Sequence, residues 1–71
     1  MRTVLLISGM RGPVCRESVA CALETVRGVI EVTVNLLRAQ ATVLHEPGCT
    51  ASELVEAVVG AGYGAVLAAV A

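Results

Sequence analysis

Cysteine is the residue type with the most chemical potential in this chain. It occurs three times, at Cys15, Cys21 and Cys49, and an odd number cannot all pair in disulfides within one chain. Free thiols are typical of a reducing compartment, so we expect a cytoplasmic protein. Thiolates bind soft metal ions such as Cu(I) and also act as nucleophiles. The cysteines therefore suggest either metal binding or covalent catalysis.

Cys15 has the most favourable surroundings of the three. Pro13 suits the first turn of a helix, which places Cys15 in that turn. The positive end of a helix dipole stabilises a thiolate and lowers its pKa. Arg11 and Arg16 add positive charge nearby. We therefore expect the Cys15 thiolate to form readily.

The first half of the chain predicts a strand, a helix and a second strand. Thr3–Ser8 is rich in strand-forming residues and stops at a glycine. A helix should begin at Pro13 and be capped at its C-terminus by Gly28. Its apolar residues recur at helical spacing, at Val19, Ala22, Leu23 and Val26. Apolar and polar residues then alternate from Val29 to Asn35, as in a half-buried strand.

The second half predicts the same three elements in the same order. Gln40–Leu44 alternates like a strand. Thr50 and Glu53 form a T-x-x-E capping box for a helix that Gly62 ends. Gly64–Val70 is expected to be the last strand. The order β-α-β-β-α-β predicts a single α+β domain over residues 1–71, with the ferredoxin-like fold: a four-stranded antiparallel sheet with both helices on one face.

This topology separates Cys15 from the other reactive side chains. Cys21 lies six residues further along the same helix, a rotation of about 600°, so it should face away. Cys49 follows a strand at the opposite end of the sheet. His45 lies at that same far end, and we expect it to be exposed to solvent. With no base near Cys15, nucleophilic catalysis is not expected, and the chain is interpreted as a binding module and not an enzyme.

The segment Ile7–Cys15 reads Ile-Ser-Gly-Met-Arg-Gly-Pro-Val-Cys. It resembles the metal-binding loop of heavy-metal-associated domains, which occur in copper-transporting P-type ATPases, copper chaperones and mercury-resistance proteins. Their hallmark is Gly-Met-x-Cys-x-x-Cys, in which Gly12 here takes the place of the first cysteine and Cys15 that of the second. Further matches to the family lie along nearly the whole chain: Ala22-Leu23, Val26, Gly28-Val29, Val32-Thr33-Val34-Asn35-Leu36, Ala41-Thr42-Val43, Pro47-Gly48, Glu56-Ala57-Val58 and Gly62-Tyr63.

The resemblance implies a copper(I) binding or trafficking domain with a weakened, single-cysteine site. Mercury(II) or another soft metal is a less favoured cargo. Cys15 would be the metal ligand. The supporting residues would be Gly9, Met10, Arg11, Gly12 and Tyr63, with Met10 packing inward and Tyr63 aligned with an aromatic residue that lies near the loop in the family.

One thiolate cannot chelate a metal alone. The resemblance implies as partner another metal-trafficking domain or the body of a transporter, and a homodimer through Cys15 is a further arrangement. An alternative is a degenerate domain that binds no metal and serves regulation or protein docking. A third is deliberate alteration of the loop over residues 11–14.

Composition and charge narrow the remaining partners. The net charge is −1, so there is no basic surplus for nucleic acid. The uncharged stretch over residues 57–71 is shorter than the roughly 20 residues that a membrane helix needs, so direct membrane insertion is not expected. Val4, Leu6 and Leu44 should point away from the helices and form an apolar outer face. We expect this face to contact another domain or a second copy.

Overall fold

The computed structural model describes residues 1–70 and contains the six predicted elements in the predicted order. They are β1 (Arg2–Ser8), α1 (Pro13–Glu24), β2 (Val29–Asn35), β3 (Gln40–His45), α2 (Ala51–Gly60) and β4 (Gly64–Val70). Within the described part of the chain, no helix is long and apolar enough to cross a membrane.

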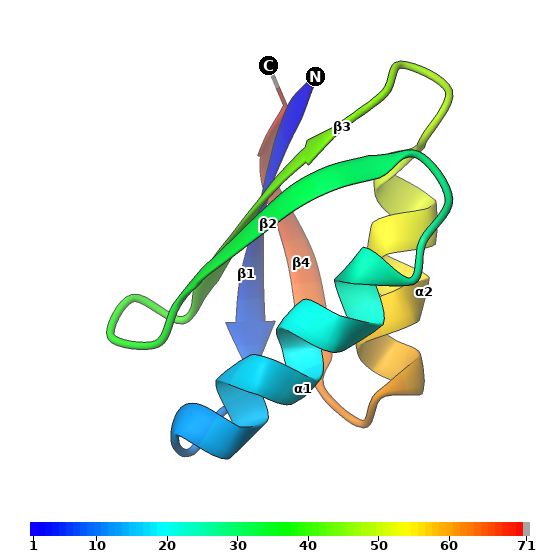
Figure 1. Ribbon diagram of the computed structural model, residues 1–71. Helices are drawn as coiled ribbons and strands as arrows, with labels where there is room; N and C mark the ends of the chain where they lie inside the picture. The colour runs from blue at the N-terminus through cyan, green and yellow to red at the C-terminus, as the bar shows by residue number, and fades with distance from the viewer. Residues whose placement is uncertain (71) are drawn as a thin grey trace.

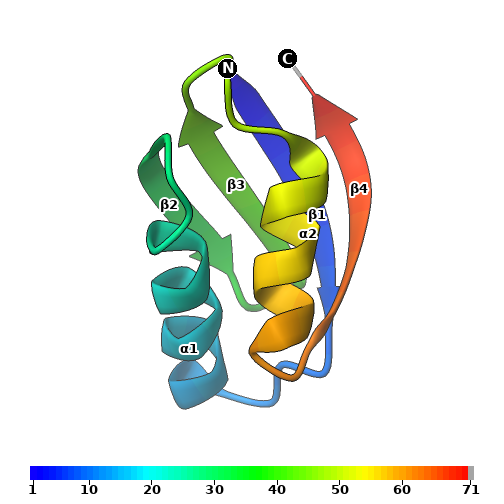
Figure 2. The ribbon, with the colours of Figure 1, turned by 90° about the vertical axis from the view of Figure 1, so that its right-hand side faces the viewer.

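The four strands form one antiparallel sheet in the order β2-β3-β1-β4. Both helices cover the same face of this sheet, side by side (Figures 1 and 2). The predicted ferredoxin-like α+β fold is thereby confirmed. The strands β1 and β3 are central in this sheet. Because both helices lie on one face, no other element within residues 1–70 covers the opposite face.

The core lies between the sheet and the helices. Each central strand and each helix contributes side chains that are at most 4% exposed: Leu5, Ile7, Val19, Leu23, Ala41, Val43, Leu54 and Val58. Small aliphatic residues fill this space because Tyr63 is the only aromatic residue of the chain. The alternation predicted for the strands and the helical spacing predicted for α1 and α2 both place these residues inward.

Gly28 does not cap α1, contrary to the prediction. The helix ends at Glu24, with Thr25 as its C-cap. Gly28 instead has φ +93°, and the Val29 amide donates to the Val26 carbonyl over 3.2 Å. β-Branched residues are poor helix formers, so Thr25 and Val26 end the helix early. The glycine serves the tight turn into β2, where positive φ is needed.

The ends of α2 follow the prediction. Thr50 caps the N-terminus, and its hydroxyl accepts from the Glu53 amide while the Glu53 carboxylate accepts from the Thr50 amide. At the other end Gly62 has φ +97°, and the Tyr63 amide donates back to the Val58 carbonyl over 3.2 Å. This is the long hydrogen bond of a Schellman motif, which turns the chain sharply and fixes where Tyr63 lies.

His45 is buried, so the expectation that it is exposed was wrong. Only 2% of it is accessible, because β3 extends one residue beyond the predicted end and His45 continues the inward series of Ala41 and Val43. Its Nε2 lies 2.6 Å from the Thr3 hydroxyl and its Nδ1 2.9 Å from the Glu46 carbonyl. A carbonyl only accepts, so Nδ1 carries the hydrogen that is shared with Glu46.

Candidate functional site

The loop between β1 and α1 is shaped by Gly9 at its start. Gly9 has φ +95°, a conformation that favours glycine. A Cβ atom at this position would lie 3.5 Å from Cδ1 of Tyr63. The absence of a side chain therefore lets the loop bend while the Tyr63 ring packs against it.

Cys15 is the third residue of α1, and Pro13 is the first. Its side chain is half-buried and carries a free thiol. Several neighbours lower the pKa of this thiol, and a hydrogen bond from the Tyr63 side chain has the largest effect. Hydrogen bonds from the backbone of Arg11 and Gly12 and the Arg11 charge also lower the pKa, whereas burial raises it. The predicted activated thiol is therefore consistent with the geometry at the start of α1.

Tyr63 is the neighbour whose effect the sequence did not predict. It enters the site from the turn after α2, at the far end of the chain from Cys15. Its own pKa is raised, chiefly because of the hydrogen bond to Cys15, while a hydrogen bond with Ser18 acts in the opposite direction. The alignment of Tyr63 with a family aromatic residue placed its ring near the loop, but only the structure places its hydroxyl at the thiol.

Met10 and Gly12 complete the loop. Met10 is half-buried and packs against the core, as predicted. Gly12 is the N-cap of α1 in an extended conformation, φ 178° and ψ −175°, that any residue adopts. A Cβ atom at Gly12 would have no heavy atom within 4 Å. The fold therefore does not require glycine where the heavy-metal motif has its first cysteine.

Comparison with known families identifies the loop and its scaffold together. The family model described as "Heavy-metal-associated domain" matches residues 4–64, which span the Cys15 loop and all elements up to the start of β4. The chain belongs to the heavy-metal-associated domain family. The resemblance inferred from the sequence is therefore confirmed.

Solved structures of similar domains include a copper-binding domain of a P-type ATPase. The copper-binding domain of HMA7, a P-type ATPase, is 30% identical with a TM-score of 0.93, over 96% of this chain and 93% of that chain. The N-terminal domain of PacS from Synechocystis PCC6803 is 33% identical with a TM-score of 0.90, over 97% and 98%. Oxidized MerP from Ralstonia metallidurans CH34 is 28% identical with a TM-score of 0.90, over 94% of each chain.

In this heavy-metal-associated domain the other two thiols are not beside Cys15. Cys21 is exposed further along α1, as the helical rotation predicted. Cys49 is only 5% exposed in the loop before α2. A Cβ atom placed at Gly28 would lie 3.2 Å from the Cβ atom of Cys49. Burial and then the Glu53 carboxylate raise the pKa of Cys49. Figure 2 shows this loop at the opposite end of the helical layer from the start of α1.

The Gly-Met-x-Cys-x-x-Cys motif has two cysteines, and among the described residues Cys15 is the one that lies at this loop. Over residues 1–70, no three His, Cys, Asp or Glu side chains gather into a group that could hold a metal ion. Cys15 thus offers one soft, partly accessible donor atom.

Proposed function

We propose that this domain is a copper(I) transfer module that contributes one thiolate, Cys15, and takes the second ligand from its partner. The observation that supports it is the Cys15 thiol, which lies at the family's ligand position with its pKa lowered by Tyr63. The partner would be another metal-trafficking domain or the body of a transporter. Mercury(II) is a less favoured cargo. It also prefers paired thiolates, so it too would need a second ligand from the partner.

The proposed transfer is ligand exchange without a change in oxidation state. A partner delivers Cu(I) bound by its own thiolates. The Cys15 thiolate forms a new bond to the metal as one partner thiolate leaves and takes up a proton. Cu(I) is soft and is well held by two thiolates, so the metal would be shared across the interface and would not be retained by Cys15 alone. The domain acts as a binding module and not as an enzyme.

The half-buried thiol at the helix start suits this role. A deprotonated Cys15 needs no base at the moment of exchange, and none of the titratable side chains shown to perturb it is a histidine or carboxylate. The three unpaired cysteines support a reducing, cytoplasmic setting, in which Cys15 would remain available.

A second candidate function is docking or regulation without metal, and Gly12 is the residue that favours it. The backbone at Gly12 would accept any side chain, and a Cβ atom there would meet open space. Packing therefore gives no reason for glycine at position 12, where the family motif has its first cysteine. A domain that had ceased to bind metal would be free to lose it while keeping the fold.

A Cu(I) titration under anaerobic conditions against a competing chelator separates the two functions. Three proteins are compared: the wild type, Cys15→Ser and Gly12→Cys. The transfer function predicts weak binding by the wild type, at about one metal ion per two chains or together with an added small thiol. Cys15→Ser should lose this binding. Gly12→Cys should bind about one metal ion per chain and at least about 100-fold more tightly, since both thiolates then belong to one molecule.

Equal behaviour of the wild type and Cys15→Ser would contradict the transfer function and leave docking. Gly12→Cys is the control for a competent loop, because its gain of binding shows that the assay detects a complete site in this fold. Circular dichroism of each variant checks that the fold is unchanged.

A further inference from the structure

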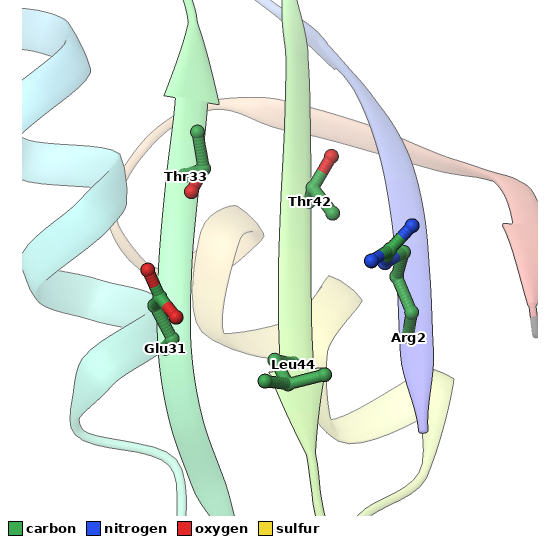
Figure 3. Close-up of a pocket in the computed structure, with 5 residues that line it drawn as sticks. All are labelled: Arg2, Glu31, Thr33, Thr42 and Leu44. Atoms are coloured by element: carbon green, nitrogen blue, oxygen red, sulfur yellow. The ribbon is translucent and has the colours of Figure 1, made fainter.

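The outer face of the sheet carries a row of side chains with opposite charges at its two ends. The strand register aligns Glu31 of β2, Leu44 of β3 and Arg2 of β1 in one row. Figure 3 shows the Glu31 carboxylate and the Arg2 guanidinium on either side of Leu44. Together with Thr33 and Thr42 these residues line a shallow hollow of about 300 Å³. The face thus has a central apolar residue with one cation and one anion beside it.

Apolar side chains continue from this row across the same face. Leu44 is 37% exposed and Leu6, also on a central strand, is 44% exposed. Val66 of β4 pairs with Leu6 in the strand register and is 65% exposed. Exposed apolar side chains on the central strands of a sheet are typical of a contact face. The predicted apolar outer face is therefore present, and its charges indicate what could cover it.

We propose that two copies of this domain pack their outer faces together about a two-fold axis parallel to β3. Arg2 and Glu31 lie on strands to either side of β3. A rotation by 180° about an axis along β3, in the plane of the interface, exchanges these two sides. Arg2 of each copy then faces Glu31 of the other, and Leu44 meets Leu44. The interface is self-complementary, as a two-fold contact has to be.

The size of the face determines how strong this contact is. The Cα atoms extend 31 × 20 × 17 Å, so one sheet face offers less than the roughly 800 Å² per partner of a standard interface. The twist of each sheet also limits close packing to the region around the axis. The dimer is therefore weak and forms in a concentration-dependent way, with two charge pairs that set its register.

Sedimentation equilibrium of the metal-free Cys15→Ser protein in reductant tests the contact without any bridge through Cys15. Over concentrations from about 10 μM to about 1 mM, the average mass should rise from 7.3 kDa towards twice that value. Arg2→Glu and Glu31→Arg should each weaken the dimer at least about tenfold, because like charges then face each other. The double variant with both changes should restore the dimer to within about threefold, since the pairs are re-formed in the opposite sense.

Two matched variants place the contact on the sheet and not on the helices. Leu6→Glu places a charge on the contact face and should weaken the dimer at least about tenfold. Val59→Glu should leave the dimer unchanged, because Val59 is 55% exposed on α2. A constant monomer mass over the whole concentration range would overturn the proposal, as would a double variant no better than the single ones. Since Cys15 is absent from this protein, neither outcome bears on metal transfer.

Discussion

At the scale of single residues, Cys15 is made reactive by a side chain from a distant part of the chain. The start of a helix and the Arg11 charge favour a thiolate, as the sequence suggested. The larger effect on its pKa is the hydrogen bond from Tyr63. A hydrogen bond donated to the thiolate stabilises it, so the thiol gives up its proton more readily. A phenol hydroxyl therefore lowers the pKa of Cys15 together with the local loop.

Removing that hydroxyl should make Cys15 less reactive. Tyr63→Phe keeps the ring but loses the hydrogen bond that lowers the Cys15 pKa, so this pKa should rise. At a pH near the wild-type midpoint, a smaller fraction of Cys15 would then be deprotonated, and alkylation by iodoacetamide would be slower. Site-resolved mass spectrometry of alkylation as a function of pH measures the midpoint.

Ser18→Ala is the companion variant, because Ser18 hydrogen-bonds Tyr63 and not Cys15. It should affect the Cys15 midpoint less than Tyr63→Phe does. An alkylation profile that is the same in Tyr63→Phe and the wild type would show that the hydroxyl has no effect on the thiol.

At the scale of the elements, the end of α2 acts on a site at the start of α1. The Schellman motif at Gly62 reverses the chain within two residues, and Tyr63 is the residue that it delivers to the loop. Gly9, with φ +95°, starts the loop, and a Cβ atom there would be in ordinary van der Waals contact with the Tyr63 ring. Two glycines with positive φ, in separate turns, thus bring Tyr63 and the Cys15 loop together.

Gly62→Ala should destabilise the domain and also disturb the site. Alanine at φ +97° is strained, which costs about 1–2 kcal/mol in the free energy of unfolding. If the turn relaxes, Tyr63 moves and the Cys15 alkylation midpoint rises. Urea unfolding measures the first effect and alkylation the second.

Gly60→Ala is the matched control for this substitution. Gly60 is helical, and a Cβ atom there would have no heavy atom within 4 Å. Alanine should therefore stabilise the domain by about 0.5–1 kcal/mol and leave the Cys15 midpoint unchanged. Equal stabilities of the two alanine variants would contradict the role given to Gly62.

At the scale of the whole molecule, His45 ties the beginning of the chain to the end of β3. Its ring bonds Thr3, which is fully buried, and the two strand ends also exchange backbone hydrogen bonds between Met1 and His45 of 2.7 and 2.8 Å. This polar pair sits at the opposite end of the sheet from Cys15. It therefore contributes to stability and not to metal binding.

Thr3→Val should cost about 1–3 kcal/mol of stability, because it leaves Nε2 of His45 buried without a partner. The double variant Thr3→Val with His45→Leu removes both polar groups. It should lose less stability than the sum of the two single variants, which indicates coupling between the two side chains. Urea unfolding of the wild type, the two single variants and the double variant completes this double-mutant cycle. Strictly additive losses of stability would contradict the pairing of Thr3 with His45.

Local sequence by itself determined most of the fold and, within the site, the loop that carries Cys15. The alternation in the strands, the apolar spacing in the helices, the capping box at Thr50 and the glycine at Gly62 all act through neighbours a few residues away, so they can be recognised without a structure. The same holds for the family loop and for Gly12 in the place of a cysteine. The end of α1 was the exception, because two β-branched residues competed with a glycine signal.

Only the tertiary structure decided what surrounds each reactive side chain. Whether His45 is exposed depended on one more residue of pairing in β3, and the hydroxyl beside Cys15 came from a turn beyond α2. Such contacts depend on strand register and on how the helices pack, which involve residues far apart in the sequence. Burial and hydrogen bonding of distant partners are properties of the assembled layers, so residue spacing alone could not reveal them.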